Sequence, residues 1–254
     1  MRLIVHGKTD KGRIRKENED AFCIEKDLGL LAIADGMGGH ASGEVASKMA
    51  IEILRDSLRK EGEPFPERLA SGVELANQAI YEAARSQSQL KGMGTTLTAV
   101  QLNGNRLAIA HVGDSRAYLI RSGVIERLTD DHTMVFEQVA RGLMTNEEAA
   151  RSDMRHILSR ALGIAPEVEV DMEALTVSEG DTLVLCSDGL SELVSEEEVL
   201  SEVQSSSRPD VACGELVHLA NQRGGADNIT VIVALLRRGN ALGRLSKMLG
   251  WRRG

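Results

Sequence analysis

The chain of 254 residues has few aromatic side chains and few cysteines. It contains only three Phe, two Tyr and one Trp, whereas proteins that bind single-stranded nucleic acid stack bases on aromatic side chains in a basic groove. Acidic residues outnumber basic ones by 38 to 30, which gives a net charge of −8. The composition therefore disfavours nucleic-acid binding. Apolar residues still reach 42%, so the core is predicted to be aliphatic.

Segments that would place the chain in or across a membrane are also missing. No apolar run approaches the ~20 residues that span a bilayer. The N-terminus turns polar after five residues, unlike a secretory signal. The three cysteines, Cys23, Cys186 and Cys213, are an odd number without paired spacing. We therefore expect a cytoplasmic, reduced protein, and nothing in the sequence requires more than a monomer.

The charge is distributed unevenly along the chain. Residues 237–254 contain five Arg, one Lys and no acid, so this tail carries +6 and the other 236 residues carry −14. Apolar residues, among them Leu242, Leu245 and Trp251, alternate with the basic ones at roughly helical spacing. Such a segment favours weak contact with an anionic membrane surface or an acidic partner. The alternative is a solvated terminus.

Hydrophobic periodicity predicts an α+β fold. Helical spacing covers 42–60, a second stretch that begins at Pro66, and a helix pair within 195–222. Short apolar runs predict strands at 30–34, 95–102, 106–111, 116–120, 124–128, 182–186 and 229–236. Turns at 103–105 and 122–123 favour one antiparallel meander over 95–128. Strands grouped in hairpins and separated by long helices indicate antiparallel sheets covered by helices.

The domain organisation follows from the same patterns. We expect a single catalytic domain over 1–236, because no internal repeat or linker divides it. Residues 129–162 are more polar, with two short helical patterns around Gly142, and are predicted to form an inserted flap. Residues 237–254 are the basic tail.

Four aspartates occupy equivalent places at the ends of predicted strands: Asp35, Asp114, Asp188 and Asp227. Any one of them could be a turn former. If the strands converge, however, two ionised groups ~4 Å apart repel by ~4 kcal/mol at an effective dielectric constant of ~20, so a cluster needs cations. Oxygen ligands without thiolates favour Mg²⁺ or Mn²⁺ over Zn²⁺. The glycine after Asp35 permits close backbone approach, so the Gly36 carbonyl is a further candidate ligand.

A paired metal site favours hydrolysis at phosphorus, because two metal ions can clamp the oxygens of an in-line displacement. The substrate phosphate then needs a cation, preferably a planar donor that grips two oxygens. Arg15, in the polar segment 11–16, is one candidate, and the alternative is that an arginine there is solvated surface. No Gly-x4-Gly-Lys-[Ser/Thr] motif is present, which excludes P-loop chemistry.

The candidate residues belong to a series of motifs that in chain order are Thr9-Asp10-Lys11-Gly12-Arg13-Ile14-Arg15-Lys16-Glu17-Asn18-Glu19-Asp20, Asp35-Gly36-Met37-Gly38-Gly39-His40, Gly94-Thr95-Thr96, Gly113-Asp114-Ser115-Arg116, Asp131-His132, Ser187-Asp188-Gly189 and Asp227-Asn228-Ile229-Thr230. Over residues 5–236 this series resembles the metal-dependent (type 2C) serine/threonine protein phosphatases, in particular their bacterial branch. The resemblance implies a four-layer α-β-β-α sandwich, in which two antiparallel sheets are flanked by helices.

The resemblance also implies residue roles. Asp35 is expected to bridge two metal ions, with the Gly36 carbonyl on the first and with Asp188 and Asp227 on the second. Asp114, together with Asp188, resembles the pair that holds a weaker third ion in bacterial members. Three further residues are expected to support the reaction: Asp20 orients metal-bound water, Asn228 holds Asp227 and the neighbouring loop, and Arg15 grips the substrate phosphate.

One position departs from the animal members of the family, which carry the proposed general acid, a histidine, where Met37 stands. Methionine cannot donate a proton. His40 and metal-bound water near Asp114 are the two alternatives.

The predicted reaction is hydrolysis of phosphoserine and phosphothreonine in proteins by a bridging hydroxide at a binuclear Mg²⁺ or Mn²⁺ site. The expected partners are phosphorylated proteins and a cognate Ser/Thr kinase whose action is reversed. The alternative is a metal-dependent phosphohydrolase of small phosphomonoesters or nucleotides. A non-catalytic binding module would lack metal-site aspartates, and none is missing.

Overall fold

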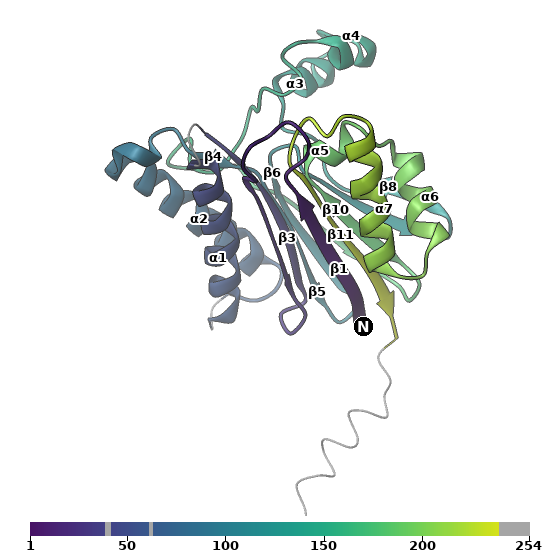
Figure 1. Ribbon diagram of the computed structural model, residues 1–254. Coiled ribbons are helices and arrows are strands. Elements are labelled where there is room, and N and C mark those ends of the chain that lie inside the picture. The colour runs from purple at the N-terminus through teal and green to yellow at the C-terminus, as the bar shows by residue number, and fades with distance from the viewer. Residues whose placement is uncertain (39–41, 61–62, 239–254) are drawn as a thin grey trace, which may run out of the picture.

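The protein is described by a computed structural model for residues 1–38, 42–60 and 63–238, and it contains two antiparallel β-sheets (Figure 1). The first sheet has the strand order β1-β11-β10-β7-β8. Its strands are β1 (Arg2–Asp10), β11 (Ile229–Arg237), β10 (Thr182–Cys186), β7 (Arg116–Arg121) and β8 (Val124–Arg127).

The second sheet has the strand order β2-β3-β5-β6-β9, and the short strand β4 pairs with β3. These strands are β2 (Asp20–Glu25), β3 (Leu30–Met37), β4 (Gly94–Thr95), β5 (Leu97–Asn103), β6 (Arg106–Val112) and β9 (Asp171–Thr176).

Helices cover the outer face of each sheet, so the molecule has four layers (Figure 1). Against the second sheet pack α1 (Ser42–Arg59) and α2 (Glu67–Ser86), which is followed by the 3-10 turn η1 (Ser88–Leu90). Against the first sheet pack α5 (Asp188–Ser191), α6 (Glu196–Ser205) and α7 (Pro209–Gln222). The four-layer α-β-β-α sandwich and the α+β class are confirmed.

The unbroken apolar runs of the sequence are explained by strands that are buried on both faces. In β3, Leu30, Ala32 and Ala34 face the helices, whereas Leu31 and Ile33 face the other sheet. In β10 the alternation is the same, because Leu183 and Leu185 point between the sheets and Val184 points to α5–α7. Side chains of a strand alternate between its two faces, so a central strand of this sandwich must be apolar at every position.

The flap projects from one end of the sandwich (Figure 1). It contains α3 (Met134–Ala140), whose N-cap Thr133 accepts a hydrogen bond from the Phe136 backbone N–H, and α4 (Asn146–Arg151), which begins with a Thr145–Glu148 capping box. These are the two short helices predicted on either side of Gly142. Of the basic tail only Arg237 and Arg238 belong to the described residues. Within the described ranges, no helix is both long and apolar enough to pass through a bilayer.

The predicted meander over 95–128 is wrong. Strands β5 and β6 pair in the second sheet, whereas β7 and β8 pair in the first. The chain crosses between the sheets at Gly113–Ser115, where Gly113 has φ +113° and a Cβ atom there would lie 2.5 Å from Thr96 Cβ. The two hairpin turns were therefore predicted correctly, but the connection between the hairpins changes sheet and carries Asp114 at the crossing point.

Candidate metal centre

The predicted site residues converge at the end of the sandwich that carries the flap. A cavity of about 540 Å³ is lined, among others, by Arg15, Asp35, Gly36, Asp114, Asp188, Asp227 and Asn228. Asp20 lies buried beside them, 6% exposed. His40 lies outside the described residues, so its role stays a prediction.

Both sheets contribute carboxylates to this cavity. Asp20 at the start of β2 pairs across the ladder with Asp35 near the end of β3. From the first sheet, Asp188 follows β10 and Asp227 precedes β11, the strand next to β10. Asp114 comes from the crossing point between the sheets. The strand register thus brings together residues that are far apart in the sequence.

Close packing of the loops that carry these residues requires glycine at two positions. A Cβ atom on Gly36 would lie 2.1 Å from the carbonyl oxygen of Gly43 at the start of α1. A Cβ atom on Gly189 would lie 2.1 Å from the carbonyl oxygen of Asn228. Such distances exclude any side chain, so the two Asp-Gly pairs let the backbones that carry Asp35 and Asp188 pack directly against their neighbours.

Burial and mutual repulsion raise the pKa values of the clustered carboxyl groups. The pKa of Asp35 lies well above its ordinary value because the group is buried and faces Asp20, Asp188 and Asp114. Burial, together with the charge of Asp188, likewise raises the pKa of Asp114 well above the ordinary value. The pKa of Asp188 is raised by burial and by Asp227. Ionising these groups together therefore requires a compensating cation.

Asp20 is held by two hydroxyl groups beneath the cluster. Its Oδ2 accepts hydrogen bonds from Thr230 Oγ1 at 2.6 Å and from Ser187 Oγ at 2.9 Å. Burial raises the pKa of Asp20 to about 7, although these two hydrogen bonds lower it. Its second oxygen, Oδ1, is buried without a hydrogen-bond partner.

The donor set fits hard divalent cations. Asp188 Oδ1, like Asp20 Oδ1, is buried without a hydrogen-bond partner. An unpaired buried carboxylate oxygen is costly unless a cation or a proton satisfies it. The four aspartates and the Gly36 carbonyl offer oxygen only, which suits Mg²⁺ and Mn²⁺.

Both polar atoms of the Asn228 side-chain amide make hydrogen bonds to the loop between β1 and β2 and hold this loop beside the cavity. Its Oδ1 accepts from the Glu19 backbone N–H at 2.8 Å, and its Nδ2 donates to the carbonyl oxygens of Lys11 and Glu17, both at 3.0 Å. Arg15 belongs to this loop, and its Nη2 donates to Asp227 Oδ2 at 2.6 Å. The other oxygen of Asp227 accepts from the Asn228 backbone N–H at 2.7 Å. These bonds hold a half-exposed guanidinium at the edge of the cavity.

The sequence did not single out four further ionisable residues that line the cavity: Glu19, Arg155, His156 and Glu192. His156 Nδ1 lies 2.6 Å from Glu192 Oε1, and one ligand atom each of His156, Glu192 and Asp188 lies within 4.8 Å of the others. Glu192 is four residues after Asp188, a helical spacing that could have indicated it. No sequence pattern shows that the flap brings His156 back to Glu192.

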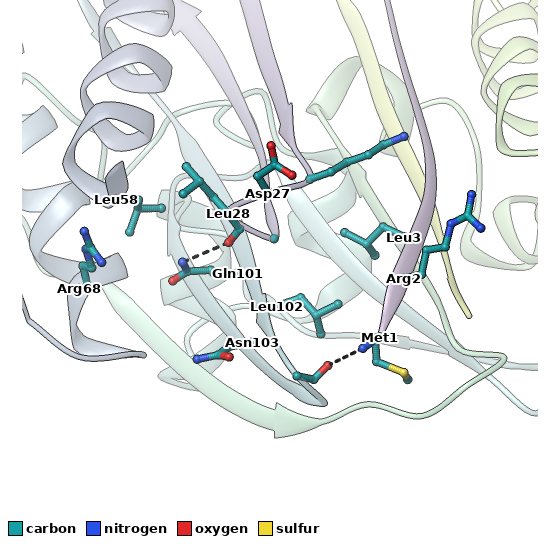
Figure 2. Close-up of a pocket in the computed structure, with 13 residues that line it drawn as sticks. Met1, Arg2, Leu3, Asp27, Leu28, Leu58, Arg68, Gln101, Leu102 and Asn103 are labelled. Carbon is teal, nitrogen blue, oxygen red and sulfur yellow. Dashed lines mark hydrogen bonds between the residues drawn. The ribbon is translucent and has the colours of Figure 1, made fainter. Parts of the chain in front are cut away.

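A second large cavity lies at the opposite end of the strands. It has a volume of about 590 Å³ and is lined by the start of β1, the β2–β3 turn and the end of β5. Figure 2 shows its hydrogen bonds, from Gln101 Nε2 to the Leu28 carbonyl at 3.3 Å and from the Met1 amino group to the Gly104 carbonyl at 3.4 Å. None of the predicted metal ligands lines it.

Comparison with known proteins agrees with this geometry. A family model described as protein phosphatase 2C matches residues 13–219. The serine/threonine phosphatase stp of Listeria monocytogenes is 38% identical, over 89% of this chain and 93% of that protein. Similarity over this length identifies a common family.

Solved structures give the same result. The Mycobacterium tuberculosis serine/threonine phosphatase PstP/Ppp superimposes with a TM-score of 0.88 at 40% identity, over 94% of this chain and 100% of that one. A structure of the PstP catalytic domain in complex with two manganese ions has a TM-score of 0.85 at 39% identity, over 93% and 99% of the two chains. The chain therefore belongs to the protein phosphatase 2C family and is a serine/threonine protein phosphatase of the bacterial type.

Proposed function

We propose that the chain hydrolyses phosphoserine and phosphothreonine in proteins with two Mn²⁺ or Mg²⁺ ions, and that it reverses the action of a Ser/Thr kinase. The observation that carries the proposal is the convergence of Asp35, Asp114, Asp188 and Asp227 from both sheets on one cavity, with a buried oxygen of Asp188 unpaired. The manganese ions in the related PstP structure support the choice of cofactor.

The aspartates of the cavity would hold the metal ions. We assign Asp35 to the position between two ions, with the Gly36 carbonyl on one side and with Asp188 and Asp227 on the other. Asp114, which faces Asp188, would hold a weaker third ion. When bound, such ions activate water and stabilise the charge on phosphoryl oxygens.

Arg15 is assigned to the substrate phosphate. Its guanidinium has five N–H donors, of which one is used by Asp227. The side chain is 53% exposed, so the remaining donors are available to two phosphate oxygens. Asn228 keeps the Arg15 loop in place through the carbonyls of Lys11 and Glu17.

Asp20 is assigned to orienting water in the cavity. Its Oδ2 is fixed by two hydroxyl donors, which leaves Oδ1 to accept from a water molecule. Met37, which lines the cavity, has no proton to donate, so the leaving alkoxide is proposed to take its proton from His40 or from metal-bound water near Asp114.

The test is turnover of a phosphothreonine peptide by the purified chain with Mn²⁺. We expect activity that stops when EDTA is added, and its loss in Asp35→Asn. The matched control is Asp27→Asn, an exposed aspartate at the opposite end of the molecule, which should keep full activity. Full activity of Asp35→Asn would overturn the assignment. Faster turnover of nucleotides than of the phosphopeptide would favour the small-phosphomonoester alternative.

A further inference from the structure

A third cavity separates the flap from the body of the protein. Its volume is about 580 Å³. The flap side includes Val135, Phe136 and Val139 on α3 and Asn146 and Ala149 on α4. The body side includes residues on β7 and β8, the segment Ser191–Leu193 at the end of α5, and Ala226.

This cavity is continuous with the candidate metal centre. Five residues line both spaces: Asp114, Arg155, Asp188, Glu192 and Ala226. A substrate whose phosphate reaches the aspartates therefore has this second space immediately beside it. A free phosphate or a small phosphomonoester is too short to fill both.

Several charged groups on the body side are paired with one another. Arg116 donates to both oxygens of Asp131, at 3.0 and 2.7 Å, and Arg127 Nη2 lies 3.2 Å from the same carboxylate. Glu192 faces His156 at 2.6 Å. These groups are therefore engaged before any ligand arrives, whereas the two aspartates that line both cavities belong to the candidate metal centre.

Apolar surface remains for a ligand. Phe136, Val139 and Leu193 are each only partly buried and border the cavity from two sides, from α3 and from the end of α5. The Arg127 guanidinium lies over the Phe136 ring, 5.9 Å from its centroid. A space bordered by apolar side chains and, away from the candidate metal centre, by paired charges suits an apolar group.

We propose that this cavity is a subsite for an apolar side chain of the phosphoprotein substrate, and that it gives the enzyme a sequence preference close to the phosphorylated residue. The proposal rests on the proposed function and names the feature of the substrate that the flap recognises. An extended chain rises ~3.3 Å per residue and turns alternate side chains to the same face. The apolar residue is therefore expected about two to four positions from the phosphoresidue.

The experiment uses phosphothreonine peptides with a polar background in which a single leucine is moved from four residues before to four residues after the phosphoresidue. The readout is kcat/KM with Mn²⁺, measured beside para-nitrophenyl phosphate, which has no peptide chain. One well-placed apolar group in a pocket is worth roughly 10-fold in kcat/KM. We expect that preference at one position and none at the others.

Two variants of the flap side test the location of the subsite. Phe136→Ala and Val139→Gln should each reduce the leucine preference to less than about 3-fold, with turnover of para-nitrophenyl phosphate unchanged. Val139→Gln guards against loosening of the flap, because it leaves the Phe136–Arg127 contact intact. The matched control is Leu143→Ala, a flap leucine that is 73% exposed and outside the cavity. It should keep the full preference.

Three results would overturn the subsite: no leucine preference at any position, a preference that survives both flap variants, or an equal loss in Leu143→Ala. Failure of the proposed function is recognised separately, since no phosphopeptide would then be hydrolysed at any leucine position, whether or not para-nitrophenyl phosphate is.

Discussion

At the scale of single residues, the clustered carboxylates of the cavity favour the binding of cations but lower the stability of the metal-free protein. Asp188 illustrates this, because it is buried, faces Asp227 and has an oxygen without a hydrogen-bond partner. Its pKa is raised, so the ionised form is less favourable in the folded protein than in the unfolded chain. Function and stability therefore make opposite demands on this side chain.

Replacing Asp188 by Asn separates the two demands. Without metal, Asp188→Asn removes one repelling charge, so we expect the free energy of unfolding in EDTA at pH 8 to rise on the order of 1 kcal/mol. Affinity for Mn²⁺ should fall by at least about 100-fold, because a ligand is lost. Urea unfolding and isothermal titration measure the two effects. A less stable variant in EDTA would contradict the repulsion on which the metal site is argued.

His111 gives the protein a stability that depends on pH. It is buried at 1% exposure, with Nε2 2.9 Å from the Asp130 carbonyl and Nδ1 2.8 Å from Thr98 Oγ1. Burial and the neighbouring His132 lower its pKa to about 4. The unfolded chain therefore binds this proton below pH ~6.5, whereas the folded protein resists it until pH ~4. His111 therefore costs the folded protein no stability above pH ~6.5, and the free energy of unfolding decreases as the pH falls from 6.5 to 4.

The predicted size of this loss is about 3 kcal/mol between pH 6.5 and 4. In His111→Gln, which lacks the titration, the free energy of unfolding should depend less steeply on pH over that range. The control is His218→Gln, at an exposed position on α7, which should keep the slope of the unaltered protein. Urea unfolding at several pH values in EDTA measures all three. Equal slopes for His111→Gln and the unaltered protein would refute the assignment.

The residues of the candidate site differ in how far the sequence reveals them. An aspartate beside glycine at the end of an apolar run is visible in the sequence, so Asp35, Asp114 and Asp188 could be chosen before the fold was known. His156 could not, because its relevance depends on the flap turning back to Glu192. Only the family motif distinguished Arg15 from the other basic residues of its segment, because its ion pair with Asp227 joins residues that are 212 positions apart.

At the scale of elements, the close contact between Gly189 and the Asn228 carbonyl oxygen sets the spacing of Asp188 and Asp227 in the candidate metal centre. Gly189→Ala would place a Cβ atom 2.1 Å from the Asn228 carbonyl oxygen. We expect destabilisation of about 1–3 kcal/mol from overpacking and weaker Mn²⁺ binding, because Asp188 and Asp227 must move apart.

The matched control is Gly214→Ala in the interior of α7. No atom lies within 4 Å of a Cβ built there. Alanine in a helix is favoured over glycine by about 0.5–1 kcal/mol, so this variant should be slightly more stable and fully active. Thermal unfolding with and without Mn²⁺ compares the two variants. If Gly189→Ala behaved like Gly214→Ala, the loops would not be in the contact described.

Strands buried on both faces and helices with one apolar face were predicted best. The strands β3, β10 and β11 are continuous apolar runs, and α1 and α2 show clear helical spacing. Besides the short β4, which the prediction did not separate from β5, three strands were not predicted. In β1 and β2 apolar and polar residues mix over partly buried edges, and β9 is exposed at most positions because it is the last strand of its sheet. These segments are strands because they pair with strands far away in the sequence, and such pairing cannot be detected from local hydrophobic periodicity.

At the scale of the whole molecule, the acidic body and its metal ions form one thermodynamic unit. Residues 1–236 carry −14, and part of that charge lies on the clustered aspartates of the cavity, where burial and mutual repulsion raise the pKa values of Asp35 and Asp188. A ligand that binds only the folded state stabilises it by about 2.7 kcal/mol at a hundred times its Kd. For a protein of this size that is roughly 5–10 °C in Tm.

The stabilisation by Mn²⁺ should increase with pH. Asp20 has a folded pKa of about 7, above its value in the unfolded chain, so without metal its contribution to stability is lost as the pH rises through 7. His111 is already neutral above pH 6.5 and does not interfere. We therefore expect a larger Mn²⁺-induced rise in Tm at pH 8.5 than at pH 6.5, and almost none in Asp188→Asn at either pH. Equal rises at the two pH values would show that the metal does not compete with protons for this cluster.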